Sequence, residues 1–185
     1  MEIVKQQKAL NKAILNIKKG KVIICPTDTV YGFLALVSNK KAVNKIFKIK
    51  KRLNSKSLPV FARDIKMAKE LAEISEEQEK ILKKYWPGKF TFVLKTHLRK
   101  NGGRHTIAIR VPKYKFLNNL LEKINKPLVQ TSVNISGEPT LTKIKDIVEK
   151  FGKHKDILII DAGNFKKSKP SKIIDLTGKN KKIIR

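Results

Sequence analysis

Short runs of apolar residues, each bounded by polar or turn-forming residues, recur along the whole chain. Residues 22–25 (Val-Ile-Ile-Cys) lie between Lys21 and Pro26, and four apolar residues bounded in this way are typical of a buried strand. Similar runs, or segments that alternate apolar and polar residues, predict further strands over 34–37, 58–62, 89–95, 106–110, 128–130, 157–160, 171–176 and 182–185. We therefore expect a sheet at the centre of the fold.

Apolar residues at helical spacing fill most of the segments between these runs. Helices are predicted over 3–19, ending at Gly20, after Ser38, over 65–72 after Asp64, from the capping box 75–78 to just before Trp86, over 114–125, and over 143–151 after Thr142. Because some strands follow one another without a helix, the pattern predicts an α/β fold with a mixed parallel and antiparallel sheet flanked by helices. No repeat or linker divides the chain, so residues 1–185 are expected to form one domain.

The charge of the chain suggests a partner but leaves two interpretations open. The chain has 43 Lys and Arg against 15 Asp and Glu, a formal net charge of +28 and a pI of about 10.3. This excess favours a polyanionic partner such as RNA. Only six of the basic residues are arginine, however, and the lysines are spread through every segment, which is equally typical of a solvated lysine-rich surface.

Several classes of protein are excluded by composition. A single cysteine, Cys25, rules out an internal disulfide and a Cys-based zinc site, and His97, His105 and His154 are too widely spaced for a local metal motif. No run of about 18 apolar residues indicates a transmembrane helix, and the first residues lack the layout of a signal peptide. We therefore expect a cytoplasmic protein that contacts no membrane.

A cluster of small polar side chains follows the strand at 22–25. Residues 25–32 read Cys-Pro-Thr-Asp-Thr-Val-Tyr-Gly, and polar groups at the end of a buried strand are typical of ligand sites in α/β folds. Hydroxyls such as those of Thr27 and Thr29 also cap helices and build turns, so both interpretations stay open.

Two other segments offer groups for an anionic ligand. Residues 50–52 (Lys-Lys-Arg), expected at or just past the end of the helix after Ser38, supply cations suited to phosphate. Ser132, Asn134 and Ser136 fall on one side of an extended backbone, although a turn after a strand uses the same residue types. Cys25 is expected to be a core residue, and no local Ser-His-Asp or Cys-His motif is present. Hydroxyls, an amide and cations without a nucleophile indicate catalysis by positioning and charge stabilisation.

Seven short motifs occur together in a fixed order. They are Pro26-Thr27-Asp28-Thr29-Val30-Tyr31-Gly32, Lys50-x-Arg52, Trp86-Pro87-Gly88, Thr106-Ile107-Ala108-Ile109-Arg110, Ser132-x-Asn134-x-Ser136-Gly137, Ser171-x-Ile173-Ile174-Asp175 and Arg185. In these motifs the chain resembles the YrdC-like L-threonylcarbamoyladenylate synthases, over about residues 5–185. The resemblance implies a single α/β domain with a twisted mixed sheet and a basic concave face. It also implies conversion of L-threonine, bicarbonate or CO2, and ATP into threonylcarbamoyl-AMP and pyrophosphate, after which a separate transferase modifies tRNA.

The resemblance implies a role for each matching residue. Lys50 and Arg52 are expected to be catalytic. The expected ATP-binding residues are Lys50, Arg52, Lys56, Thr106, Ser132, Asn134, Thr142 and Arg185, and the expected threonine-binding residues are Thr29, Tyr31, Arg110 and Ser171. Mg²⁺ is expected to arrive with ATP, without a protein metal site and without a tightly bound cofactor.

The chain departs from the family pattern at two positions. Lys56 stands where many relatives have Asn near ATP, and Phe61 stands where many have His near threonine, which leaves both roles open. Because the chain ends at Arg185, it is expected to lack the additional C-terminal domain of longer members, and the loop 164–170 is the candidate for closing the site.

Two other functions fit parts of the pattern. A non-catalytic RNA-binding module acting on tRNA or ribosomes would explain the charge, although the aromatic content of 6% is low for an RNA reader. Weak tRNA contact through the basic surface is compatible with an enzyme as well. A carbamoyl-adenylate-forming domain of a hydrogenase-maturation enzyme would be fused to other domains, including zinc modules, for which this chain has neither the length nor the cysteines.

Overall fold

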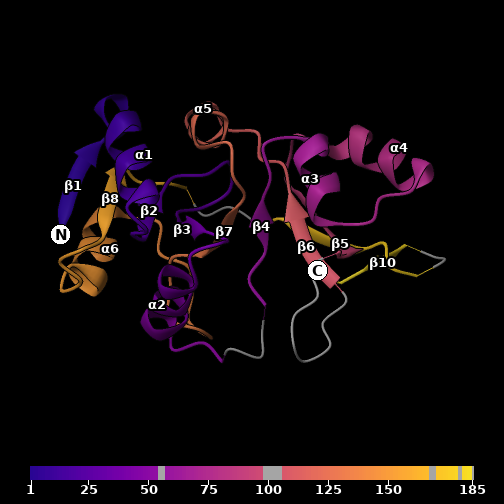
Figure 1. Ribbon diagram of the computed structural model, residues 1–185. Coiled ribbons are helices and arrows are strands. Elements are labelled where there is room, and N and C mark those ends of the chain that lie inside the picture. The colour runs from indigo at the N-terminus through magenta and orange to yellow at the C-terminus, as the bar shows by residue number, and fades with distance from the viewer. Residues whose placement is uncertain (54–56, 98–105, 167–169, 179–180, 185) are drawn as a thin grey trace.

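One sheet runs through the whole molecule in the computed structural model, which describes residues 1–53, 57–97, 106–166, 170–178 and 181–184 (Figure 1). Within these residues the strand order is β1-β8-β2-β3-β7-β4-β6-β5-β9-β10. The strands are β1 (Glu2–Lys5), β2 (Ile23–Cys25), β3 (Gly32–Leu36), β4 (Val60–Phe61), β5 (Phe90–Lys95), β6 (Thr106–Arg110), β7 (Leu128–Ser132), β8 (Leu158–Asp161), β9 (Lys172–Asp175) and β10 (Lys182–Ile183). The helices are α1 (Leu10–Lys18), α2 (Lys40–Lys50), α3 (Ile65–Leu71), α4 (Glu76–Tyr85), α5 (Lys115–Ile124) and α6 (Ile144–Phe151), with a short 3₁₀ helix over Gln6–Lys8.

The sheet mixes parallel and antiparallel pairs. The neighbours β2, β3, β7 and β4 pair antiparallel, whereas β1 with β8, β8 with β2, β4 with β6, and β5 with β9 pair parallel. The mixed α/β architecture expected from the sequence is therefore confirmed. None of the helices in the described part of the chain is long and apolar enough to cross a bilayer.

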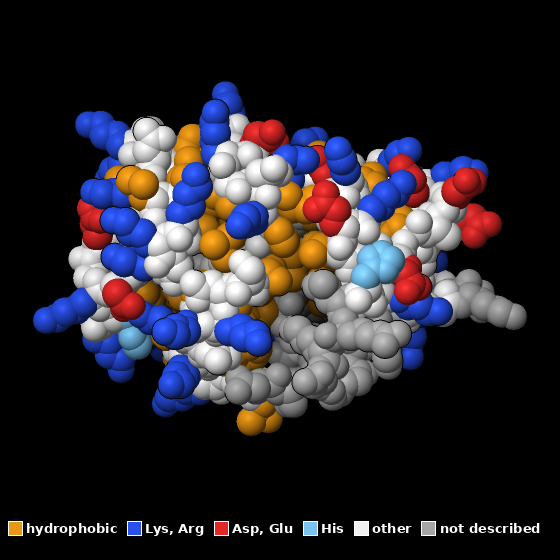
Figure 2. Space-filling view, viewed as in Figure 1, with side chains coloured by type: hydrophobic (Ala, Val, Ile, Leu, Met, Phe, Trp, Pro, Cys, Tyr) orange, Lys and Arg blue, Asp and Glu red, His pale blue; other side chains and the backbone are white. Residues whose placement is uncertain are grey.

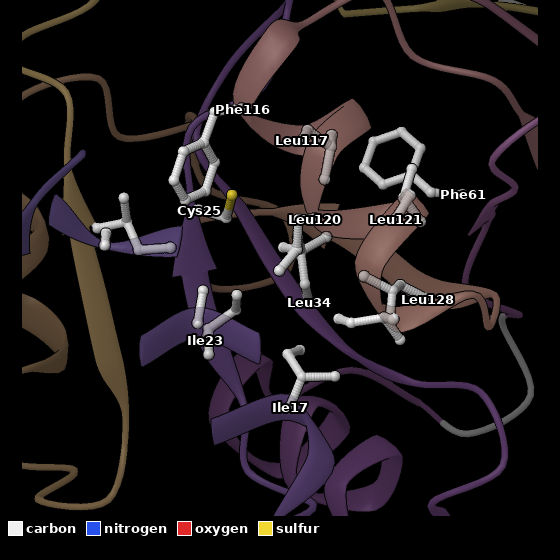
Figure 3. Packing of buried hydrophobic residues seen from close by; sticks show 14 of the residues in the cluster. Ile17, Ile23, Cys25, Leu34, Phe61, Phe116, Leu117, Leu120, Leu121 and Leu128 are labelled. Atoms are coloured by element: carbon white, nitrogen blue, oxygen red, sulfur yellow. The ribbon is translucent and has the colours of Figure 1, made fainter. Parts of the chain in front are cut away.

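Alternation along the buried strands divides the core between the two faces of the sheet. In β2, Ile23 and Cys25 pack with α1 and α5 in one cluster (Figure 3), whereas Ile24 packs with α2 and α6 in another. A third cluster packs α3 and α4 against β5 and β6 and includes Phe92 and Ile109. The run 22–25 is apolar throughout because both faces of its strand are covered.

Three of the helices α1–α6, namely α2, α3 and α4, begin at a residue whose side chain caps them. Asp64 and Ser75 cap α3 and α4 as predicted, and Ser75 forms a complete capping box with Gln78. The cap of α2 is Asn39, whose Oδ1 accepts from the N–H of Ala42 at 2.9 Å, and not Ser38. Ser and Asn are nearly equal as caps, so only the observed start at residue 40 distinguishes these neighbours.

The segment 3–19 is not one helix, contrary to the prediction. Residues 2–5 form the strand β1, which pairs parallel with β8, and α1 begins only at Leu10. Ile3 is 44% exposed at this edge of the sheet. The strand forms because it pairs with residues more than 150 positions later, which local periodicity does not reveal.

Thr142 does not cap α6, also contrary to the prediction. The residue before the helix is Lys143, and the N–H of Ile144 donates to Oδ1 of Asn164 at 3.1 Å. The acceptor therefore comes from the segment after β8, and it ties the start of α6 to that segment.

Candidate active site

The loop between β2 and β3 is shaped by Thr27. Its Oγ1 accepts from the N–H groups of Thr29 and Val30, at 3.1 and 3.2 Å, and donates to the carbonyl of Val30 at 2.6 Å. Thr27 thus has the turn-forming role that the sequence left open. The hydroxyl of Thr29 instead lies 3.5 Å from Nη1 of Arg110.

Arg110, at the end of β6, is a buried cation held by three separate segments. Its Nε donates to the carbonyl of Gly88 at 2.9 Å, its Nη2 pairs with Asp28, and its guanidinium lies 5.7 Å from the ring centroid of Phe61. Burial lowers the pKa of Arg110 and the Asp28 carboxylate opposes that shift, but a guanidinium stays charged at any physiological pH. Phe61, whose role the sequence left open, is the aromatic neighbour of this cation.

Ser171 and Thr91 form a second polar pair close to Arg110. Their hydroxyl oxygens are 3.0 Å apart, and both residues are buried. Phe92 pairs with Ile109 across β5 and β6, so one step further along this register Thr91 lies opposite Arg110 and points to the same side. The predicted threonine-binding residues Thr29, Arg110 and Ser171 therefore belong to one neighbourhood.

Asp28, Gly88 and Thr91 were not predicted to be site residues. Asp28 and Gly88 lie inside recognised motifs, but nothing in the sequence pairs them with Arg110. Thr91 alternates with Phe90 and Phe92 in β5, and only the structure shows that this polar residue is buried.

Lys50, the last residue of α2, forms a second centre. It is 2% exposed, and its Nζ donates to the carbonyl of Ser132 at 2.6 Å, to the carbonyl of Asn134 at 2.9 Å and to Oδ1 of Asn134 at 2.7 Å. Burial lowers the pKa of Lys50 to about 8, and the positive charge of Arg52 acts in the same direction. An ammonium has three N–H donors, so protein acceptors account for all of them.

Residues 132–138 wrap around this end of α2. Oδ1 of Asn134 also accepts from Oγ of Ser132 at 2.7 Å, and its Nδ2 donates to the carbonyl of Glu138 at 2.6 Å. The N–H of Ser136 donates to the carbonyl of Lys50 at 2.8 Å. Ser132 and Asn134 therefore meet at Lys50, a contact that their spacing in the sequence did not predict.

Arg52 and Thr106 lie near the same end of the sheet as Ser132. Lys51 ends α2 with a left-handed φ of 49°, after which the half-buried Arg52 donates from Nη2 to the carbonyl of Ser57 at 3.2 Å. Burial lowers the pKa of Arg52. Val60 of β4 pairs with Ile109 of β6, which is parallel to it, and with Val129 of β7, which is antiparallel to it. Thr106 is three residues before Ile109 and Ser132 is three residues after Val129, so the two residues lie at the same level of the sheet on either side of β4. Two strand spacings, about 10 Å, separate them.

Tyr31 and Thr142 contact the segment after β8. The hydroxyl of Tyr31 donates to the carbonyl of Gly163 at 2.8 Å and accepts from the N–H of Ala162 at 2.9 Å, while its ring packs 4.7 Å from that of Phe165. The carbonyl of Thr142 accepts from the N–H of Phe165 at 2.8 Å. Burial raises the pKa of Tyr31 to about 12. The Tyr31 hydroxyl therefore holds residues 162–163.

Some predicted features are not part of this geometry. Lys56, Arg185 and the middle of the loop 164–170 lie outside the described residues. In the part of the chain that the structure describes, no group of His, Cys, Asp and Glu is arranged to hold a metal ion. A groove of about 460 Å³, lined in part by Arg63 and Trp86, includes none of the predicted site residues.

Comparison with known proteins gives relatives for the whole chain. The family model Sua5/YciO/YrdC, described as telomere recombination, matches residues 16–185. A putative threonylcarbamoyl-AMP synthase of Methanocaldococcus jannaschii is 38% identical over 172 residues, which cover 90% of this chain and 78% of the relative. The threonylcarbamoyl-AMP synthase of Pyrococcus abyssi is 36% identical over 167 residues, which cover 87% of this chain and 48% of the relative. This chain thus spans about half the length of the P. abyssi protein.

Solved structures of the same family have the same fold as this chain. P. abyssi Sua5 complexed with L-threonine superposes with a TM-score of 0.87 at 32% identity, covering 100% of this chain and 56% of that one. Escherichia coli YciO superposes with a TM-score of 0.86 at 26% identity, covering 100% of this chain and 92% of that one. The sequence match over residues 16–185 and the shared fold lead to one conclusion: the chain belongs to the Sua5/YciO/YrdC family.

Proposed function

We propose that this protein is an L-threonylcarbamoyladenylate synthase, which makes threonylcarbamoyl-AMP and pyrophosphate from L-threonine, bicarbonate or CO2, and ATP. The relatives from M. jannaschii and P. abyssi carry this activity in their names, and the P. abyssi structure contains L-threonine. The observation that carries the proposal is the buried guanidinium of Arg110, with the hydroxyl of Thr29 beside it and the Ser171–Thr91 pair next to it.

This arrangement fits an amino acid with a hydroxyl side chain. A guanidinium presents N–H groups in a planar fork that matches a carboxylate. Surrounding hydroxyls add donors and acceptors for the amine and the threonine hydroxyl. We therefore assign L-threonine to the neighbourhood of Thr29, Arg110 and Ser171, close to Tyr31.

The nucleotide fits the second centre. Along β6, Thr106 and Arg110 are four residues apart, a separation of about 13 Å at the usual rise of a strand. That length suits a threonylcarbamoyl group at one end and adenylate at the other. Arg52 is the cation assigned to phosphate contact, together with Thr106, Ser132 and Asn134 and, outside the described residues, Lys56 and Arg185. Mg²⁺ would enter bound to the ATP phosphates.

Lys50 has a more specific part in this proposal. Because its three donors go to protein acceptors, it acts on the nucleotide through its charge and through the segment 132–134 that it holds. A fixed positive charge in a buried place favours the pyrophosphate leaving group as negative charge builds up.

The reaction needs no nucleophile from the protein. The threonine amine, after losing a proton, attacks CO2 and forms a carbamate with release of a second proton. A carbamate oxygen then attacks the α-phosphorus of ATP, and the bond to the β-phosphate oxygen breaks to release pyrophosphate. Cys25 is buried in the core and burial raises the pKa of its thiol, so it does not compete as a nucleophile. The protein contributes position and charge.

The product would pass to a separate tRNA threonylcarbamoyl transferase complex in the cytoplasm.

The surface near the N-terminal part of the chain is basic. Residues 1–52 contain 13 Lys and Arg but only Glu2 and Asp28 as acids. Figure 2 shows Lys and Arg side chains over the α1 and α2 side of this face, with acidic side chains mainly toward α3 and α4. This surface supports the proposed weak contact with tRNA.

The test is pyrophosphate release by the purified protein. We expect release that requires ATP, L-threonine and bicarbonate together, and L-serine or L-valine should replace threonine poorly. Tight RNA binding without pyrophosphate release under these conditions would favour the non-catalytic RNA-binding module instead.

A further inference from the structure

Asp28 contacts the predicted substrate-binding arginine directly. One carboxylate oxygen, Oδ1, accepts from Nη2 of Arg110, and the other, Oδ2, accepts from the N–H of Lys113 at 3.1 Å. The side chains of Asp28 and Arg110 are 6% and 2% exposed. This is a buried ion pair whose carboxylate is also anchored to the backbone that leads from β6 to α5.

The pair fixes the orientation of the guanidinium. Nε donates to the carbonyl of Gly88 at 2.9 Å while Nη2 donates to Asp28. Since a guanidinium is planar, two donors held on different atoms set both its plane and its rotation in that plane. Nη1 is then the nitrogen turned toward the hydroxyl of Thr29, 3.5 Å away.

The charge of Asp28 also keeps Arg110 in place. A buried cation without a partner is strongly unfavourable and would swing toward water or draw water in. Apart from Asp28, the described contacts of the guanidinium are with the Gly88 carbonyl, the Thr29 hydroxyl and the Phe61 ring, and the Ser171–Thr91 pair nearby is also neutral, so none of these groups carries a negative charge.

We infer that Asp28 is a positioning residue for L-threonine, because it holds the Arg110 guanidinium with its Nη1 side toward the place where the substrate carboxylate binds. The inference rests on the proposed function and adds a residue to it. Asp28 touches Arg110 and not the reacting atoms, so its effect falls on threonine binding and not on the transfer step.

A different role for Asp28 predicts the opposite result. Its carboxylate could stand in for the substrate carboxylate and be displaced when threonine binds, in which case removing the charge would strengthen threonine binding. The bond from the Lys113 N–H to Oδ2 argues against displacement, because the carboxylate is held from both sides.

The experiment compares Asp28→Asn with the wild-type protein. The carboxamide has nearly the same shape, but it puts an N–H₂ donor against either Arg110 or the Lys113 N–H, so one bond is lost. The Michaelis constant for L-threonine should rise about tenfold, while kcat at saturating threonine stays within about threefold. The dissociation constant of an ATP analogue should not change. Asp156→Asn, which removes a surface ion pair with Lys45, is the matched control and should leave every constant unchanged.

A second variant covers the case in which Asp28→Asn does not fold. Asp28→Glu keeps the charge but moves it by one methylene, so it cannot meet both donors in the same geometry, and the Michaelis constant for threonine should rise by a smaller factor. An unchanged or lower Michaelis constant in the folded variants, or equal weakening of threonine and ATP-analogue binding, overturns the inference. If the wild-type protein itself neither binds threonine nor releases pyrophosphate, the proposed function fails first and the inference fails with it.

Discussion

Replacing Lys50 by methionine removes a buried charge while keeping the shape of the side chain. The methionine retains the apolar stem that places Nζ 5.8 Å from the ring centroid of Phe33. Three hydrogen bonds are lost, to the carbonyls of Ser132 and Asn134 and to Oδ1 of Asn134. Bonds to a charged group are worth about 1.5–3 kcal/mol each, which gives an upper limit of roughly 5–9 kcal/mol. Burying the ammonium offsets several kcal/mol of this, so we expect a net loss of about 2–3 kcal/mol in the free energy of unfolding.

Thermal unfolding and pyrophosphate release measured on the same samples test this expectation. For a chain of this size the loss corresponds to a melting temperature lower by roughly 5–10 °C, with turnover at least about a hundredfold lower because the segment 132–134 loses its support. Arg52→Ala is the comparison: Arg52 is only half-buried, so turnover should fall while the melting temperature stays within about 2 °C. A Lys50→Met protein that melts like wild type would refute the view that Lys50 holds residues 132–134.

Three further predictions concern the charge of Lys50, the hydroxyl of Tyr31 and the thiol of Cys25. With burial lowering the pKa of Lys50 to about 8, its ammonium is charged below that pH and neutral above it, so kcat/KM for ATP should fall as pH rises through about 8; a profile that stays flat to about pH 10 would contradict this. Tyr31→Phe removes both bonds to residues 162–163, so the Ala162 amide should exchange its hydrogen faster, and an unchanged exchange rate would speak against this contact. Cys25→Ala should keep turnover within about twofold and cost about 1 kcal/mol of stability, whereas loss of turnover in the folded variant would point to a catalytic thiol.

Local patterns predicted most elements because their causes are local. The apolar run 22–25, the Asp64 cap and the Ser75 capping box each involve residues within a few positions of one another. The failures involve distant partners. β1 forms by pairing with β8, and Asn164 replaces Thr142 as the acceptor at the start of α6. Period and propensity describe neighbours along the chain and contain no information about such contacts.

In the candidate site, too, the sequence identified single residues but not the contacts between distant ones. Motif order identified Lys50, Asn134 and Arg110, and the structure gives each of them a buried, hydrogen-bonded position. Motif order did not predict that all three donors of Lys50 go to the protein, nor that Asp28 pairs with Arg110. These contacts join residues more than 80 positions apart, so only the fold reveals them.

A crystal structure with L-threonine and a non-hydrolysable ATP analogue tests the central claim most directly. The account predicts that the threonine carboxylate binds Arg110 on its Nη1 side next to Thr29, with the α-phosphate between this point and Arg52. Threonine bound away from Arg110, for example in the groove beside Arg63 and Trp86, or a nucleotide on a different face from threonine, would contradict the account.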